Sequence, residues 1–192
     1  VAVIDTERFR AEASVPAGSV PTRAVLQPDG RYLWIGNNAR EPGRGGVTVI
    51  DADTLKVAAT LATGAGHHEI VVSEDSRHAL ATNRDDGTAT LVDVRTLRRL
   101  RDYRIGGVPI AAAYSAVSKA FYVADARGGA IHVLRPDTDA AAARIALRPG
   151  LGPMRFTPDG RFLLGLNPSE DLVHVIDAAT NRAVHELHVQ GQ

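Results

Sequence analysis

Val49-Ile50-Asp51 opens a series that decides the fold, because related triplets follow it at a fixed interval. Leu91-Val92-Asp93 comes 42 residues later, and Val133-Leu134-Arg135 and Val175-Ile176-Asp177 continue the series at the same spacing. A period of this length, filled with short β-rich runs between turn residues, is typical of a four-stranded propeller blade. The sequence therefore predicts an all-β fold, a β-propeller segment made of four-stranded antiparallel blades with a 42-residue repeat.

Each repeat contains four expected strands, named A to D in chain order. Strands A and B are apolar almost throughout, as at 70–72 and 121–123, whereas strand C alternates more and strand D is polar, as at 97–102. A strand that is buried on both faces needs a continuous apolar run. The gradient predicts a radial arrangement with strand A at the axis and strand D at the rim.

The repeats divide the chain into about four and a half blades of one propeller domain. Residues 1–16 supply strands C and D of an incomplete blade, and the complete blades follow at 17–63, 64–105, 106–147 and 148–192. An open arc would expose an apolar blade face at each end, so we expect the remaining blades to come from missing chain. The absence of an initiator Met favours an upstream segment that has been removed. The alternative to a larger ring is a five-bladed propeller.

Composition limits the partners. Twenty-two basic and 22 acidic residues leave no net charge, which argues against nucleic acid, since phosphate binding needs a basic excess. No apolar run reaches the length of a transmembrane segment. Cysteine is absent, so any metal site must rely on histidine and carboxylate ligands. A protein partner or a small ligand fits this chain best.

Turns and loops separate the two faces of the predicted propeller. One face carries uniform turns: Pro-Asp-Gly at 28–30 and 158–160 between strands A and B, and Asp-x-x-Thr from Asp51, Asp93 and Asp177 between strands C and D. The opposite face carries the B-to-C and D-to-A loops, which differ between repeats after a shared Asn or Asp. Binding residues usually lie on such variable loops.

The repeat resembles the YVTN-type propeller repeat, with Pro21 leading through Pro28-Asp29-Gly30-Arg31 to Asn37, and Phe121-Tyr122-Val123 before Asp125. The same sequence style is shared by the haem d1 propeller of cytochrome cd1 nitrite reductases, by methylamine dehydrogenase heavy chains and by lactonase-like propellers. This resemblance implies a seven-bladed ring and a periplasmic or secreted protein. It also implies that a histidine at the axial mouth can hold a haem d1-type tetrapyrrole.

His67 and His68 are the candidate cofactor and metal ligands, because they occupy the D-to-A loop where other repeats have Pro21-Thr22 and Pro109-Ile110. Imidazole there can bind copper, zinc or a tetrapyrrole iron. Adjacent residues of an extended segment point to opposite sides, however, so both rings cannot easily reach one metal. The alternative is that His67 and His68 are polar loop residues that bind no ligand.

The other candidates are charged. Arg40, Arg44, Arg84 and Arg127 lie on the variable face and can clamp a carboxylate or propionate, and the alternative is solvated loop charge. Acidic residues at 85, 86, 170 and 171 offer oxygen ligands or ordinary turns. We expect Trp34 in the core, and His132 and His174, which stand 42 residues apart on strand C, should not converge on one ion.

Three functions remain open. The leading hypothesis is a non-catalytic extracytoplasmic propeller that binds a protein or small ligand through its variable loops, since no catalytic motif is recognised. The second is a metal or haem d1-type carrier that uses His67 or His68. A lactonase, or an amine or nitrite oxidoreductase, is the third.

Overall fold

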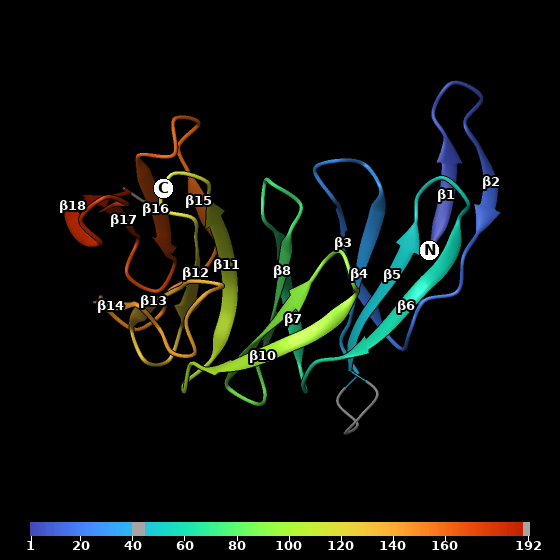
Figure 1. Ribbon diagram of the computed structural model, residues 1–192. Helices are drawn as coiled ribbons and strands as arrows, with labels where there is room; N and C mark the ends of the chain where they lie inside the picture. Colours follow the sequence, from blue (N-terminus) through green and yellow to red (C-terminus); the bar gives the residue numbers. More distant parts are fainter. Residues whose placement is uncertain (40–44, 190–192) are drawn as a thin grey trace.

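The computed structural model describes residues 1–39 and 45–189. Within these residues the chain is all β, with 18 strands in five antiparallel sheets and no helix. Figure 1 shows the sheets following one another in an open arc, from the N-terminal hairpin to the C-terminal sheet. The predicted fold is confirmed: the protein is a partial β-propeller. No helix in the described part is long and apolar enough to cross a membrane.

The strands meander within each sheet, each pairing with its neighbour in sequence. The two-stranded sheet contains β1 (Ala2–Asp5) and β2 (Arg10–Ser14). The four-stranded sheets, numbered here as blades 1 to 4, contain β3 (Pro21–Leu26), β4 (Tyr32–Asn37), β5 (Gly46–Asp51) and β6 (Lys56–Ala62); β7 (His67–Val72), β8 (His78–Asn83), β9 (Thr88–Asp93) and β10 (Arg98–Arg104); β11 (Pro109–Ser115), β12 (Ala120–Asp125), β13 (Ala130–Leu134) and β14 (Ala143–Ala146); and β15 (Met154–Phe156), β16 (Phe162–Asn167), β17 (Leu172–Asp177) and β18 (Arg182–His188).

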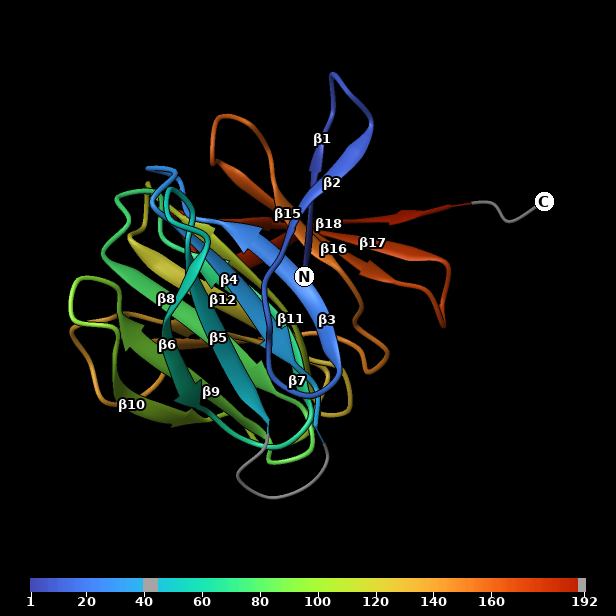
Figure 2. The same ribbon diagram turned by 90° about the vertical axis from the view of Figure 1, so that its right-hand side faces the viewer.

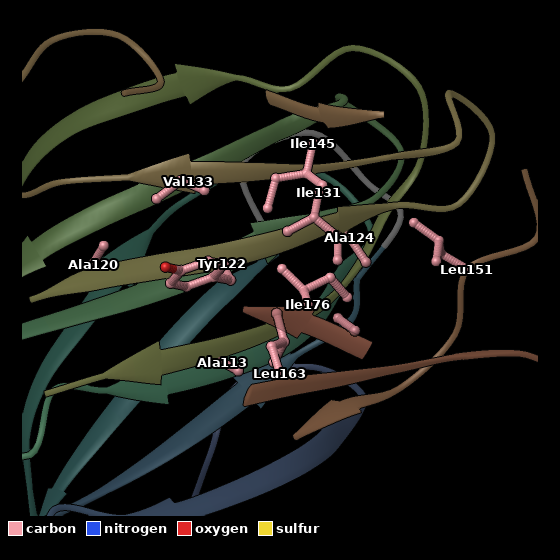
Figure 3. Packing of buried hydrophobic residues seen from close by; sticks show 11 residues of the cluster. Ala113, Ala120, Tyr122, Ala124, Ile131, Val133, Ile145, Leu151, Leu163 and Ile176 are labelled. Atoms are coloured by element: carbon pink, nitrogen blue, oxygen red, sulfur yellow. The ribbon is translucent and has the colours of Figure 1, made fainter. Parts of the chain in front are cut away.

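The core consists of apolar layers between consecutive blades. Figure 3 shows one of them, where Tyr122 and Ile131 of blade 3 pack against Leu163 and Ile176 of blade 4. Trp34 is 1% exposed in the layer between blades 1 and 2, and its indole N–H donates to Gln27 Oε1 at 3.1 Å, which confirms its predicted place in the core. Each blade is therefore held by its neighbours rather than by a core of its own.

Burial does not follow the predicted gradient in full. The D strands β6 and β18 are largely exposed, as predicted, but β3 is largely exposed too, and β15 is only half-buried. The prediction that every A strand is buried on both faces is wrong there, because the A strands line an open axial groove. The C strands β5 and β13 are as buried as the B strands β4 and β12.

Two sets of hydrogen bonds hold the two faces of the arc, which Figure 2 shows from a second direction. On one face, Asp51, Asp93 and Asp177 each accept bonds from the amide and hydroxyl of the threonine three residues later. These bonds confirm the predicted turn chemistry. On the opposite face, each B-to-C loop bonds to a D-to-A loop, as where the Arg84 amide donates to the Gly66 carbonyl at 2.9 Å. This second face is called the mouth below.

Candidate site at the mouth of the axial groove

His67 and His68 are the first two residues of β7, so the prediction that they belong to a loop is wrong. The D-to-A segment is short, and the chain begins to pair with β8 already at His67, which is opposite Asn83. The register then shifts before Ile70, so that His68 lies in a β-bulge. The same irregularity isolates Thr22 in β3 and Ile110 in β11. Bulges of this kind re-aim a side chain next to binding sites.

The two imidazoles have opposite environments, in line with the expectation that adjacent side chains of an extended segment point to opposite sides. His67 is fully buried, whereas His68 is exposed. A Cβ added to Gly36 of blade 1 would lie 2.0 Å from His67 Nε2, so the ring occupies the space that this glycine leaves empty. Neither ring nitrogen of His67 has a hydrogen-bond partner within the described structure. Burial, with a smaller contribution from the nearby His68 and Arg23, lowers the pKa of His67 to about 4, so the ring is neutral at pH 7.

Both histidines border a hollow of about 310 Å³ whose other walls come from blades 1 and 2. Arg84 belongs to the loop after β8, and its Nε donates to Asp85 Oδ1 at 2.8 Å, which raises the pKa of the guanidinium. The complete lining is Thr22, Arg23, Asn38, His67, His68 and Arg84. The hollow therefore brings imidazoles and guanidinium groups together where the sequence predicted a ligand.

Arg23 joins this hollow to the axial groove. Its Nε donates to Glu69 Oε1 at 2.8 Å, its Nη2 contacts Glu69 Oε2, and this pairing raises the pKa of the guanidinium. The groove has a volume of about 780 Å³ and is bordered by Arg23, Glu69 and apolar residues of β11 and β15. Hollow and groove thus share one cation, at the boundary between blades 1 and 2.

The structure does not gather all the predicted residues. Arg127 is exposed in the loop after β12 and does not line the hollow. Arg40 and Arg44 lie outside the described residues. The sequence analysis singled out neither Arg23 nor Glu69, although both occupy equivalent places in consecutive A strands and could have been found by aligning blades 1 and 2.

Two more histidines are buried on C strands. His132 lies in β13 of blade 3 and His174 in β17 of blade 4. His174 Nδ1 lies 3.2 Å from Glu186 Oε1 but without hydrogen-bond geometry. Nowhere in residues 1–39 and 45–189 do three His, Asp or Glu side chains gather in a way that could hold a metal ion.

These features define a class of protein, a β-propeller with imidazoles and guanidinium groups at the mouth of its axial groove. The chain belongs to the cytochrome D1 heme domain family, whose model matches residues 1–192. It is 27% identical over 210 residues to dihydro-heme d1 dehydrogenase of Pseudomonas aeruginosa, an alignment that takes in the whole chain and 40% of that protein. The chain thus spans about two fifths of the length of this relative.

Solved structures are also similar to this chain. The chain is similar to dihydro-heme d1 dehydrogenase NirN in complex with DHE, with 25% identity and a TM-score of 0.77 over 99% of this chain and 42% of that one. Hydrazine synthase of Kuenenia stuttgartiensis gives 23% identity and a TM-score of 0.79, over 92% of this chain and 51% of that one. The Cps50 (Swd1) propeller domain of Myceliophteria thermophila gives 17% and 0.75, over 92% and 58%. These last two support the fold alone.

The protein is therefore a d1-haem-domain propeller related to NirN. Among the three functional hypotheses, this finding supports the second, the haem d1-type propeller, better than the leading one.

Proposed function

We propose that the mouth of this propeller binds a d1-type tetrapyrrole, with His68 facing the metal and Arg23 and Arg84 facing the carboxylates of the ring. One observation carries the proposal: these three side chains line a single hollow, in a chain of the d1 haem domain family. Carboxylates suit arginine, whose planar fork can bind them in bidentate geometry.

The donor set favours a tetrapyrrole over free copper or zinc. Structural zinc takes four protein ligands and catalytic zinc usually three, but the described residues offer no group of three such side chains. A tetrapyrrole supplies four nitrogens of its own, and one protein imidazole is enough to hold its iron. The hollow supplies that imidazole, so the residues present fit a tetrapyrrole.

His68 and His67 have different roles in this proposal. His68 is exposed in a bulge and reaches a ligand without any change in the packing. His67 is neutral and fully buried behind it, so its nitrogens could reach a ligand only after the blade interface opened. When bound, the tetrapyrrole would supply its redox and ligand-binding chemistry, and the chain would orient it and shield one face.

The hollow of about 310 Å³ is at the lower limit of the roughly 300 to 1,000 Å³ of pockets that bind drug-sized ligands. It would therefore hold only one edge of a tetrapyrrole. The groove of about 780 Å³, which shares Arg23 with the hollow, leaves room for the rest of the ligand below the mouth.

The absence of catalysis and the export of the protein to the periplasm are predictions, and the second of them rests on the family resemblance.

A haemin titration of the full-length protein tests the proposal by absorption spectroscopy. We expect stoichiometric binding with a shifted Soret band, loss of that shift in His68→Ala, and retention of it in His67→Ala. His78→Ala is the matched control, since His78 begins β8 on the turn face. Unchanged binding in His68→Ala would refute the assignment.

A further inference from the structure

Glu69 occupies the place in β7 that Arg23 occupies in β3, and the two side chains meet across the boundary of blades 1 and 2. The contact is bidentate, with Arg23 Nε and Nη2 facing the two carboxylate oxygens of Glu69. The Glu69 side chain is 15% exposed, whereas that of Arg23 is 49% exposed. The carboxylate is thus the sheltered partner and the guanidinium the accessible one.

Glu69 is fixed from its own blade. Its amide donates to Thr82 Oγ1 at 3.0 Å, and the amide of Ile70 donates to Glu69 Oε1 at 3.3 Å. A carboxylate held in this way restricts the long, flexible side chain of Arg23 to one orientation. A guanidinium carries five N–H donors in a rigid fork, so it can donate to one carboxylate along one edge and to a second carboxylate along another.

We propose that Glu69 is a positioning residue that holds Arg23 at the mouth, so that the pair selects a ligand with free carboxylates. This inference rests on the proposed function and names the chemical class of its ligand, a carboxylated tetrapyrrole rather than a neutral one. Blades 3 and 4 have Ala111 and Pro153 at the same place, so the device is confined to the corner that carries His68.

Affinities for haemin and for haemin dimethyl ester, measured on the full-length protein, test the inference. The ester keeps the iron and the ring and removes the carboxylate charges. We expect the unmodified protein to prefer haemin, and Glu69→Gln to lose roughly tenfold in affinity for haemin, the scale of one charge-assisted hydrogen bond, with little change for the ester. Arg23→Ala should behave in the same way, and the double variant should be no weaker than Arg23→Ala alone.

Glu74→Gln is the matched control, because Glu74 also borders the groove but is exposed and makes no ion pair in the described structure. It should leave both affinities unchanged. A Glu69→Gln variant that binds haemin as well as the unmodified protein, or more tightly, would overturn the positioning role while the proposed function stood. Equal loss for haemin and ester would also overturn it, since that pattern indicates general damage. Failure of the unmodified protein to bind either compound would overturn both.

Discussion

The entrances to blades 2 and 3 share a backbone but not a chemistry. In both, the residue after the B strand donates its amide to the D-to-A segment, from Arg84 to Gly66 and from Ala126 to Val108, each at 2.9 Å. Blade 2 then presents His67 and His68, where blade 3 presents Pro109 and Ile110. The comparison teaches that the scaffold fixes the position of these two residues and leaves their identity free, which is how a repeated fold acquires a single site.

Converting the entrance of blade 2 into that of blade 3 should have the largest effect. We expect His67→Pro/His68→Ile to lose at least about 100-fold in haemin affinity, roughly 2.7 kcal/mol, because the imidazole that faces the iron is gone. The thermal midpoint should also fall, because replacing His67 leaves the space beside Gly36 unfilled, whereas His68→Ile alone should lose affinity at an unchanged midpoint. Titration and thermal denaturation check this, and retained binding would contradict the assigned corner.

The second-largest effect is expected from low pH, which should destabilise the protein through His67, a residue without an equivalent histidine in blade 3. The pKa of His67 is about 4 when folded, against roughly 6.5 when unfolded, so the unfolded state binds more protons between these values. Stability should therefore fall as pH drops from about 6.5 to 4, by roughly 3 kcal/mol at most. Urea unfolding at several pH values should show a shallower decline for His67→Leu. An identical decline would mean that His67 does not titrate in this way.

Gly36 tests the packing of blade 1 against that histidine. We expect Gly36→Ala to cost about 2 kcal/mol, because the new methyl group would overlap His67 Nε2. The equivalent residue of blade 3 is Ala124, and the core layer that contains it has Leu151 of blade 4 at the position equivalent to His67. In a His67→Ala background the cost should largely vanish. Equal costs in both backgrounds, measured by urea denaturation, would place the strain elsewhere.

The turn face should affect stability without affecting binding. Asp93→Ala removes the acceptor of two 2.7 Å hydrogen bonds, from the Thr96 amide and hydroxyl. We expect a loss of about 1.5 kcal/mol, given the usual contribution of such bonds. Haemin affinity should be unchanged, because this turn lies opposite the mouth. A change in affinity at constant thermal midpoint would refute the separation of the faces.

The smallest effect is expected at the A-to-B turns. Ser76 has a φ of 55°, at the position where blades 1 and 4 have Gly30 and Gly160 with φ of 79° and 67°. Ser76→Gly should therefore gain roughly 0.5 kcal/mol by relieving backbone strain. Ser118 of blade 3 is outside the left-handed region, so Ser118→Gly should show no gain. Denaturant midpoints of the two variants check this difference.

The sequence allowed much of the fold to be predicted, because the period and the turn residues are local signals. It failed on the burial of β3 and β15, since exposure to the groove depends on which strands face one another across the arc. At the mouth it found His67, His68 and Arg84. The burial of His67 depends on Gly36, a residue of another blade, and the Arg23–Glu69 pair also crosses a blade boundary, so neither has a signal within one repeat.

The bulges at Thr22, His68 and Ile110 have a consequence for engineering. A residue carried outside the hydrogen-bond ladder can be exchanged while the pairing on either side is kept. These three positions, one in each of blades 1 to 3, can therefore be substituted independently of the strand pairing at the mouth. A combinatorial library that randomises them together would vary the chemistry presented to a guest molecule while the strand registers that build the propeller stay the same.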